Sequence, residues 1–133
     1  MRRAILADTG PLYAAVDPSD SHHRRAQAEM SRLKRERREL FLAYPTLCES
    51  YSLVLYRLGK PATANWLEQV LGGAALLNPA PEDYLEATKK LRDYSDQSIT
   101  LFDAVVAVLA RRLSAEVWTF DHHFDLMRVA VWR

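Results

Sequence analysis

The sequence has almost no cysteine, little glycine and no long apolar run. Its single cysteine, Cys48, excludes an internal disulfide and fits a reducing compartment such as the cytoplasm. Only four residues are glycine and 49% are hydrophobic, a composition that argues against disorder. No apolar run approaches the roughly 18 residues of a membrane span, and the apolar stretch in MRRAILADTG is too short for a signal peptide. We therefore expect a compact cytoplasmic protein with no membrane segment.

The chain also lacks an excess of either charge. Lysine and arginine total 18 against 17 acidic residues, so any basic surface for nucleic acid must be local. No linker, repeat or low-complexity tract interrupts the 133 residues, a length that suits one hydrophobic core. We expect a single domain spanning residues 1–133.

Short apolar segments alternate along the chain with longer segments of helical character. The predicted strands are apolar throughout and cover residues 4–7, 40–45, 74–78, 116–121 and 129–132. The predicted helices cover 21–38, 46–59, 62–73, 81–95 and 100–113, with a short helix or turn at 11–20. Uniformly apolar strands joined through helices are typical of a parallel sheet covered on both faces, so we predict an α/β fold.

Four acidic residues stand where such a fold binds ligands. Asp8 follows a predicted strand, Asp121 comes immediately after the EVWTF of another, Glu49 lies one turn into the helix after the second strand, and Asp103 opens the apolar helix 100–113. In an open parallel sheet, ligands bind beyond the carboxyl ends of the strands. We therefore expect these four carboxylates to converge on one rim of the sheet.

Each acid could instead be a helix cap. Glu49 follows Thr46 with capping-box spacing, Asp103 follows Thr100 in the same way, and the other two acids are acceptable N-caps. Convergence has a cost, because two carboxylates ~4 Å apart repel by about 4 kcal/mol at an effective dielectric near 20. A divalent cation converts that repulsion into binding energy, and all-oxygen ligands favour Mg²⁺ or Mn²⁺ over Zn²⁺.

The ordered set of acids carries a family resemblance that covers nearly the whole chain. Through ILADTGPLYA, PTLCESYSLVLYRLG and DQSITLFDAVVAVLARRLSAEVWTFDHHFD, the sequence resembles PIN-domain ribonucleases, and in particular the VapC-type toxins of prokaryotic toxin–antitoxin pairs. The resemblance implies a three-layer α/β/α domain with a short central parallel sheet. It also implies that Asp8, Glu49, Asp103 and Asp121 bind one or two Mg²⁺ or Mn²⁺ ions, that the protein cleaves RNA, that a cognate antitoxin inhibits it, and that it forms a homodimer.

Phosphodiester hydrolysis gives each acid a task. Metal ions held by carboxylates lower the pKa of bound water and neutralise charge on the phosphate. We expect Asp8 and Asp103 to be direct ligands, and Glu49 and Asp121 to hold a second metal or to orient the water. Hydroxyl groups that support the ligands from behind are expected from Thr9, Thr119 and Thr100. Thr100 is included because Phe102 stands where family members often carry threonine or serine.

The adjacent histidines His122 and His123 are the other metal-ligand types near Asp121. Because the side chains of neighbouring residues usually point in different directions, we expect that they cannot both join one metal site. Zinc sites prefer histidines spaced along one helix face, or cysteine partners. A role near the scissile phosphate stays open, since histidine titrates near neutral pH.

Basic residues are concentrated in the predicted helix 21–38. An electrostatic track for the RNA backbone would use Arg24, Arg25, Arg32 and Arg35. The same surface could bind an acidic antitoxin tail, or could simply be a solvated helix face. An apolar stripe of Tyr51, Val54, Leu55 and Leu58 could serve a dimer or an antitoxin groove.

Two other functions fit parts of the pattern. A catalytically inactive domain of this type could bind RNA or a protein only, although the presence of all four acids argues against it. A phosphoacceptor receiver domain needs an aspartate after its third strand and a lysine near its last, but Asn78 ends AALLN, and VAVWR has no lysine. The sequence therefore predicts a metal-dependent endoribonuclease toxin, without specifying which RNA it cleaves.

Overall fold

The computed structural model describes residues 4–133, and its strands form one parallel sheet. The strands are β1 (Ala4–Ala7), β2 (Glu39–Ala43), β3 (Ala75–Leu77) and β4 (Glu116–Trp118), in the order β3-β2-β1-β4. Strand β1 is central, since its Ile5 pairs with Leu40 of β2 on one side and with Glu116 of β4 on the other. The predicted parallel sheet is confirmed.

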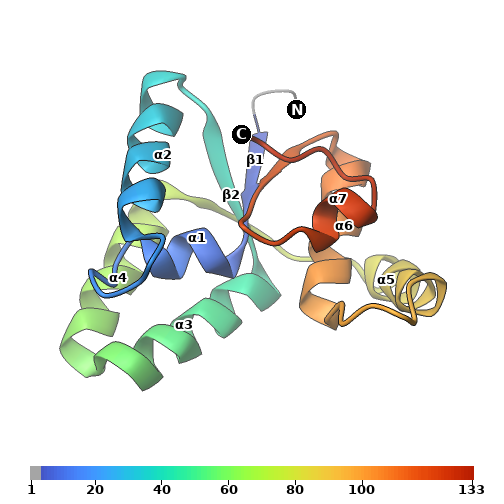
Figure 1. Ribbon diagram of the computed structural model, residues 1–133, viewed down its shortest axis with the longest axis horizontal. Helices are drawn as coiled ribbons and strands as arrows, with labels where there is room; N and C mark the ends of the chain where they lie inside the picture. The colour runs from blue at the N-terminus through green and yellow to red at the C-terminus, as the bar shows by residue number, and fades with distance from the viewer. Residues whose placement is uncertain (1–3) are drawn as a thin grey trace.

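Helices cover both faces of this sheet, as predicted. They are α1 (Thr9–Ala14), α2 (His23–Arg35), α3 (Tyr44–Leu58), α4 (Lys60–Gly73), α5 (Pro81–Asp93), α6 (Leu101–Leu113) and α7 (His123–Leu126). Helices α1 to α4 lie on one side of β1 and β2, and α5 to α7 lie on the other (Figure 1). Within residues 4–133, no helix is both long enough and apolar enough to cross a membrane.

Strand β1 is apolar throughout because both of its faces are buried. Successive residues of a strand point to opposite faces, so Ala4 and Leu6 join the core beneath α6, while Ile5 and Ala7 join the core beneath α1 and α2. Helix α6 is itself buried continuously from Ala104 to Ala110. A polar residue on β1 would therefore meet a core on either face, which leaves only its carboxyl end for a charged group.

Polar contacts fix both ends of α6. At its start, the backbone N–H of Asp103 donates to Thr100 Oγ1 at 3.2 Å, and the N–H of Thr100 donates to Asp103 Oδ2 at 3.3 Å. Near its end, Arg112 donates hydrogen bonds of 3.0 and 2.9 Å to the buried carboxylate of Asp83 on α5. The helix stops at Ser114, which has a left-handed φ of 52°. Asp103 is thus held at a defined position at the edge of the sheet.

Several predicted boundaries are wrong at the ends of elements; for example, β2 ends at Ala43 rather than at residue 45, and α2 ends at Arg35 rather than at residue 38. Helix α3 begins at Tyr44 rather than at residue 46, because Pro45 is well suited to the first helical turn, where its missing N–H has no partner to lose. Strand β4 ends at Trp118, because the chain turns where the Asp121 N–H donates to Thr119 Oγ1 at 2.9 Å. The predicted last strand, 129–132, is a single bridge.

The C-terminal segment does not continue as a regular strand because the chain reverses just before it. Arg128 has a left-handed φ of 58°, and beyond it only Val131 pairs with the sheet, opposite Val117. Val117 accepts a 2.9 Å hydrogen bond from Trp132 and donates one of 2.9 Å to Ala130. These bonds cover the outer edge of β4 without extending it.

Candidate functional site

The four acidic residues line one open pocket at the carboxyl edge of the sheet. Asp8 follows β1 directly, Asp121 follows β4 after a short turn, Glu49 lies in the second turn of α3, and Asp103 lies in the first turn of α6. The pocket has a volume of about 470 Å³, and its lining also includes Thr9, Gly10, Thr100, Phe120 and His122. The fold therefore brings together four carboxylates that are far apart in the sequence.

Threonine hydroxyls contact two of these carboxylates, those of Asp8 and Glu49. Thr119 donates a 2.8 Å hydrogen bond to Asp8 Oδ2, and the same hydroxyl accepts the N–H of Asp121. Thr9 donates to Glu49 Oε1 and in turn accepts a 3.1 Å bond from Ser50. These contacts restrict the orientation of the acids that face the pocket.

Helix capping accounts for two of the acids and not for the other two. Asp103 forms the capping box with Thr100 described above, and Asp121 Oδ1 accepts the N–H of His123 at 2.9 Å. Asp8 stands at the N-cap of α1 but makes no side-chain capping bond. Glu49 cannot cap α3 with Thr46, because the helix begins two residues before Thr46. Asp8 and Glu49 therefore have carboxylates placed at the pocket without a capping role.

The electrostatic environment of the pocket disfavours negative charge. The pKa of Asp8 is raised from 3.8 to about 6, chiefly by burial and also by the nearby Asp103 and Glu49, against the opposing hydrogen bond from Thr119. Burial also raises the pKa of Asp103, with a contribution from Asp121, while His123 lowers it. A bound cation would relieve both the desolvation and the repulsion, so this set of carboxylate oxygens fits Mg²⁺ or Mn²⁺.

The histidines lie closer together than predicted. The rings of His122 and His123 are 4.4 Å apart, and each Nδ1 faces Asp121 Oδ1, at 3.7 and 3.1 Å respectively. The expectation that their side chains diverge is wrong, because the short helix α7 begins between them and folds both rings back toward Asp121. Among residues 4–133, only these three residues form a group of three metal-ligand side chains whose ligand atoms all lie within 4.8 Å of one another. The four carboxylates share a pocket but are spread more widely.

The basic residues of α2 differ in how they relate to the pocket. The Arg25 guanidinium lies 4.3 Å from the ring centre of Phe120, which lines the pocket, and it pairs with Glu29 at 3.3 Å. The guanidinium of Arg32 instead lies 3.9 Å from the ring centre of Trp132, which does not line the pocket. Arg24 and Arg35 are exposed on the same helix.

Phe120 lines the pocket although it was not predicted from the sequence as a site residue. Its ring contacts both the Arg25 guanidinium and the His22 ring, whose centre lies 5.1 Å away. Its position between Thr119 and Asp121 is the only signal that the sequence offers. The contact joins the beginning of α2 to the loop that carries Asp121, so the basic helix begins at the rim of the acidic pocket.

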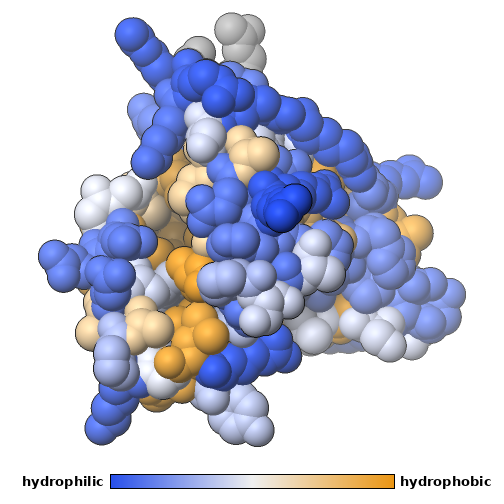
Figure 2. Space-filling model, turned by 60° about the vertical axis from the view of Figure 1, so that its left-hand side comes forward, coloured by the Kyte–Doolittle hydropathy of each residue, from blue (hydrophilic) through white to orange (hydrophobic). Residues whose placement is uncertain are grey.

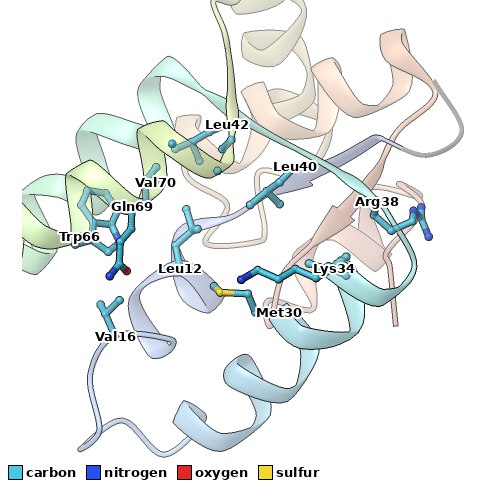
Figure 3. A pocket seen from close by; sticks show the side chains of 14 residues that line it. Leu12, Val16, Met30, Lys34, Arg38, Leu40, Leu42, Trp66, Gln69 and Val70 are labelled. Carbon is cyan, nitrogen blue, oxygen red and sulfur yellow. The ribbon is translucent and has the colours of Figure 1, made fainter.

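A second, apolar cavity of about 550 Å³ lies between α1, α2, β2 and α4. Figure 2 shows apolar surface set back between hydrophilic side chains on this side of the molecule. Leu12, Met30, Trp66 and Val70 point into the cavity, and the side chain of Lys34 extends along it beside Met30 (Figure 3). The residues predicted as an apolar stripe on α3 do not line this cavity. One of them, Val54, is instead fully buried in a cluster with Tyr13 and Trp66.

The model of the PIN domain family matches residues 5–130. The chain belongs to the PIN-domain family. This PIN domain is similar in structure to VapC20 of Mycobacterium tuberculosis, described as a sarcin–ricin loop cleaving toxin, with a TM-score of 0.83 and 19% identity over 97% of this chain and 98% of that one. No curated protein sequence matches it.

Two further structures have the same fold. FitAcB from Neisseria gonorrhoeae has a TM-score of 0.70 and 23% identity, over 97% of this chain and 96% of that one. VapBC2 from Rickettsia felis, solved with a fragment of promoter DNA, has a TM-score of 0.72 and 14% identity, over 98% and 97%. At these identities the similarity concerns the fold, and the chemistry of this PIN domain has to be argued from its own residues.

Proposed function

We propose that this PIN domain is a Mg²⁺- or Mn²⁺-dependent endoribonuclease and the toxin of a toxin–antitoxin pair. The observation that carries the proposal is the pocket lined by Asp8, Glu49, Asp103 and Asp121, in which Asp8 and Glu49 have no capping role. Membership of the PIN family supports nuclease chemistry. The toxin assignment rests on the likeness to VapC20 and to toxin–antitoxin complexes such as VapBC2.

In this proposal Asp8 and Asp103 hold the catalytic ion, while Glu49 and Asp121 hold a second ion or orient the attacking water. An ion bound there supplies a water of lowered pKa and positive charge beside the scissile phosphate. Thr119 keeps the Asp8 carboxylate directed at the pocket, and Thr9 does the same for Glu49. Asp103 keeps its place through the capping box with Thr100.

Arg25 is the basic residue best placed to guide the RNA backbone to these acids. It lies over Phe120 at the pocket rim, and its guanidinium offers a charged contact for a phosphate adjacent to the scissile one. Arg24 and Arg35 extend the positive surface along α2 and add affinity without specificity. We keep Arg32 as a weaker candidate, because it pairs with Glu36 at 3.1 Å and lies over Trp132.

A cleavage assay with a matched binding assay tests this function against the inactive binding module. We expect the purified chain to cut single-stranded or structured RNA with Mg²⁺ or Mn²⁺, and to bind but not cut it with a chelator. Retention of RNA without cutting in either metal would favour the binding module. Cutting that persists in the chelator would exclude the metal-dependent mechanism.

We propose that the antitoxin inserts an apolar segment with acidic flanks into the cavity between α2 and α4. The cavity lining is largely apolar, and Lys34 extends along it (Figure 3), so an acidic group beside an apolar anchor would complement both. A similar structure with a TM-score of 0.63 is a toxin–antitoxin complex from Klebsiella pneumoniae, which supports a protein partner for this fold.

Co-expression with the protein encoded by the adjoining reading frame tests this partner. Native protein should co-purify with it, and Lys34→Glu should weaken the complex by reversing a charge on an exposed side chain. Lys60→Glu, on an exposed lysine outside the cavity, is the matched control. Equal recovery of both variants would argue against this cavity. The homodimer is a separate proposal, which light scattering of the purified chain would test.

A further inference from the structure

The side chains of Asp121, His122 and His123 come together at one edge of the acidic pocket. His123 Nδ1 lies 3.1 Å from Asp121 Oδ1, His122 Nδ1 lies 3.7 Å from the same oxygen, and the two rings are 4.4 Å apart. One ligand atom from each residue lies within 4.8 Å of the other two. Two nitrogen donors and one carboxylate thus face a common space.

These separations match those of atoms that share a metal ion. Two donors about 2.1 Å from one ion lie roughly 3.0–3.4 Å apart at tetrahedral or octahedral angles. The 3.1 Å pair falls in that range, and the 3.7 Å pair needs only a small rotation of His122, whose side chain is 74% exposed. The geometry is therefore nearly preformed on the His123 side and adjustable on the His122 side.

His123 also has a donor atom with no partner. Its side chain is only 14% exposed, and Nδ1 is buried without a hydrogen bond, since the contact with Asp121 lacks hydrogen-bond geometry. A buried nitrogen that faces a carboxylate without bonding to it is unfavourable unless something occupies the space between them. A metal ion would bind both atoms at once.

From this geometry we propose a second metal site, formed by Asp121, His122 and His123, which binds a transition-metal ion of the Zn²⁺ class. Imidazole nitrogens with one carboxylate suit Zn²⁺, Co²⁺ or Ni²⁺, whereas Mg²⁺ prefers oxygen ligands throughout. The site is distinct from the proposed Mg²⁺ site in its donors but shares Asp121 with it. Water completes the coordination, because three protein ligands leave at least one position open.

Sharing Asp121 gives the site a regulatory consequence, which rests on the proposed function. Asp121 also lines the acidic pocket and contributes to the raised pKa of Asp103. An ion held by Asp121 and the histidines withdraws that carboxylate and places positive charge beside the pocket. Zn²⁺ at low concentration should therefore antagonise Mg²⁺ binding, and with it cleavage.

Metal titrations of the full chain test the site without relying on activity. Calorimetry should give one Zn²⁺ site per chain, and Co²⁺ should develop the visible absorption of a nitrogen-ligated ion. His122→Ala and His123→Ala should each weaken Zn²⁺ binding by more than about tenfold, since even outer partners of metal ligands are worth about 10–100-fold in affinity. His22→Ala is the matched control, because His22 also lies near an aspartate, Asp20, at 3.7 Å, but outside the group.

Substitutions in the two proposed metal sites should have opposite effects on the binding of Mg²⁺ and Zn²⁺. The histidine variants should keep native Mg²⁺ affinity, whereas Asp8→Asn should lose Mg²⁺ and keep Zn²⁺. Absence of Zn²⁺ binding to the native chain, or equal Zn²⁺ affinity in all three histidine variants, would overturn the second site. Loss of Mg²⁺ binding in His122→Ala or His123→Ala would also overturn it, since the histidines would then belong to the Mg²⁺ site. Thermal melts of each variant, and the conservative variant His122→Gln, show whether any loss of metal binding comes from misfolding.

Discussion

Thr119 donates a 2.8 Å hydrogen bond to Asp8 although 111 positions separate them in the chain. The bond is possible because β4 pairs with β1, with Trp118 opposite Ala7, and because the N–H of Asp8 donates to the carbonyl oxygen of Trp118 at 2.9 Å. Asp8 and Thr119, which directly follow Ala7 and Trp118, therefore lie at the same edge of the sheet. The order of the strands thus places a buried carboxylate and the hydroxyl that orients it side by side.

Replacing Thr119 with valine should weaken Mg²⁺ binding by about 10–100-fold, the usual cost of removing an outer partner of a metal ligand. The hydroxyl lowers the pKa of Asp8, so its loss should raise that pKa above about 6. Calorimetry measures the affinity, and NMR titration of the Asp8 carboxyl measures the pKa. Thr119→Ser, which keeps the hydroxyl, should behave almost as the native protein; if it were as weak as valine, the hydrogen bond would not be the cause.

The metal-free protein should lose stability as the pH rises from about 4 to 7. Folding raises the pKa of Asp8 from 3.8 to about 6, so the native state holds this proton more tightly than the unfolded state does. The contribution of the protonated Asp8 to the free energy of unfolding is fully present below pH 4 and is lost as the pH rises through 6. A pKa shift of about two units corresponds to a contribution of about 3 kcal/mol.

Urea denaturation in a chelator, at steps between pH 4 and 8, measures this dependence. Asp8→Asn cannot ionise and should flatten the curve over that interval. A native curve that rises with pH in the same interval as Asp8 titrates would show that the carboxylate is stabilised, not strained, in the metal-free fold.

Asp103→Asn should have opposite effects on stability with and without metal. The asparagine oxygen can still accept the N–H of Thr100, so the cap of α6 is retained while one charge leaves the pocket. Without metal, the variant should be more stable by roughly 0.5–2 kcal/mol, as is usual when an active-site conflict is relieved. Native protein should gain about 2.7 kcal/mol from Mg²⁺ at a hundredfold excess over its dissociation constant, and the variant should gain less.

Chemical denaturation of both proteins, in chelator and in Mg²⁺, measures the four stabilities. Asp96→Asn is the control, because Asp96 is an exposed acid outside the pocket. If Asp103 only capped its helix, Mg²⁺ would stabilise native protein and Asp103→Asn equally, and this result would contradict a role for Asp103 as a metal ligand.

Arg25→Gln should weaken the binding of RNA in the presence of a chelator and reduce the salt dependence of binding by about one phosphate contact. The reason is the position of the guanidinium over Phe120 at the pocket rim. Filter binding at several salt concentrations gives both quantities. Arg111→Gln, on an exposed arginine at the end of α6, is the control, and an equal slope for the two variants would remove Arg25 from the RNA surface.

Most of the architecture could be predicted because the strands form short, largely apolar runs, and burial on both faces makes β1 apolar throughout. AILA has no polar residue, so the chain had to leave the core at Asp8, the first charged residue after it. A similar argument placed Asp121 after EVWTF, although the strand itself ends at Trp118. The pocket acids could be proposed from sequence because the carboxyl ends of parallel strands share one edge.

The side-chain geometry around Asp121 could not be predicted. The orientation of His122 and His123 depends on where α7 begins, and a four-residue helix leaves no periodic pattern in the sequence. The contact of Phe120 with Arg25 depends on how α2 docks beside the loop, which is a long-range packing event. The bridge at Val131 depends on a left-handed Arg128, a conformation that arginine does not signal.

The rate of RNA cleavage in Mg²⁺, measured for the native chain, Asp8→Asn and Asp96→Asn, tests the central claim most directly. Asp8 is the buried carboxylate with no capping role, so its replacement separates a metal ligand from a structural acid. We expect the native chain and Asp96→Asn to cleave at similar rates, and Asp8→Asn to cleave about 100-fold more slowly or worse, the usual cost of losing stabilisation of transition-state charge. Undiminished cleavage by folded Asp8→Asn would contradict the assignment of this pocket as a metal-dependent ribonuclease site.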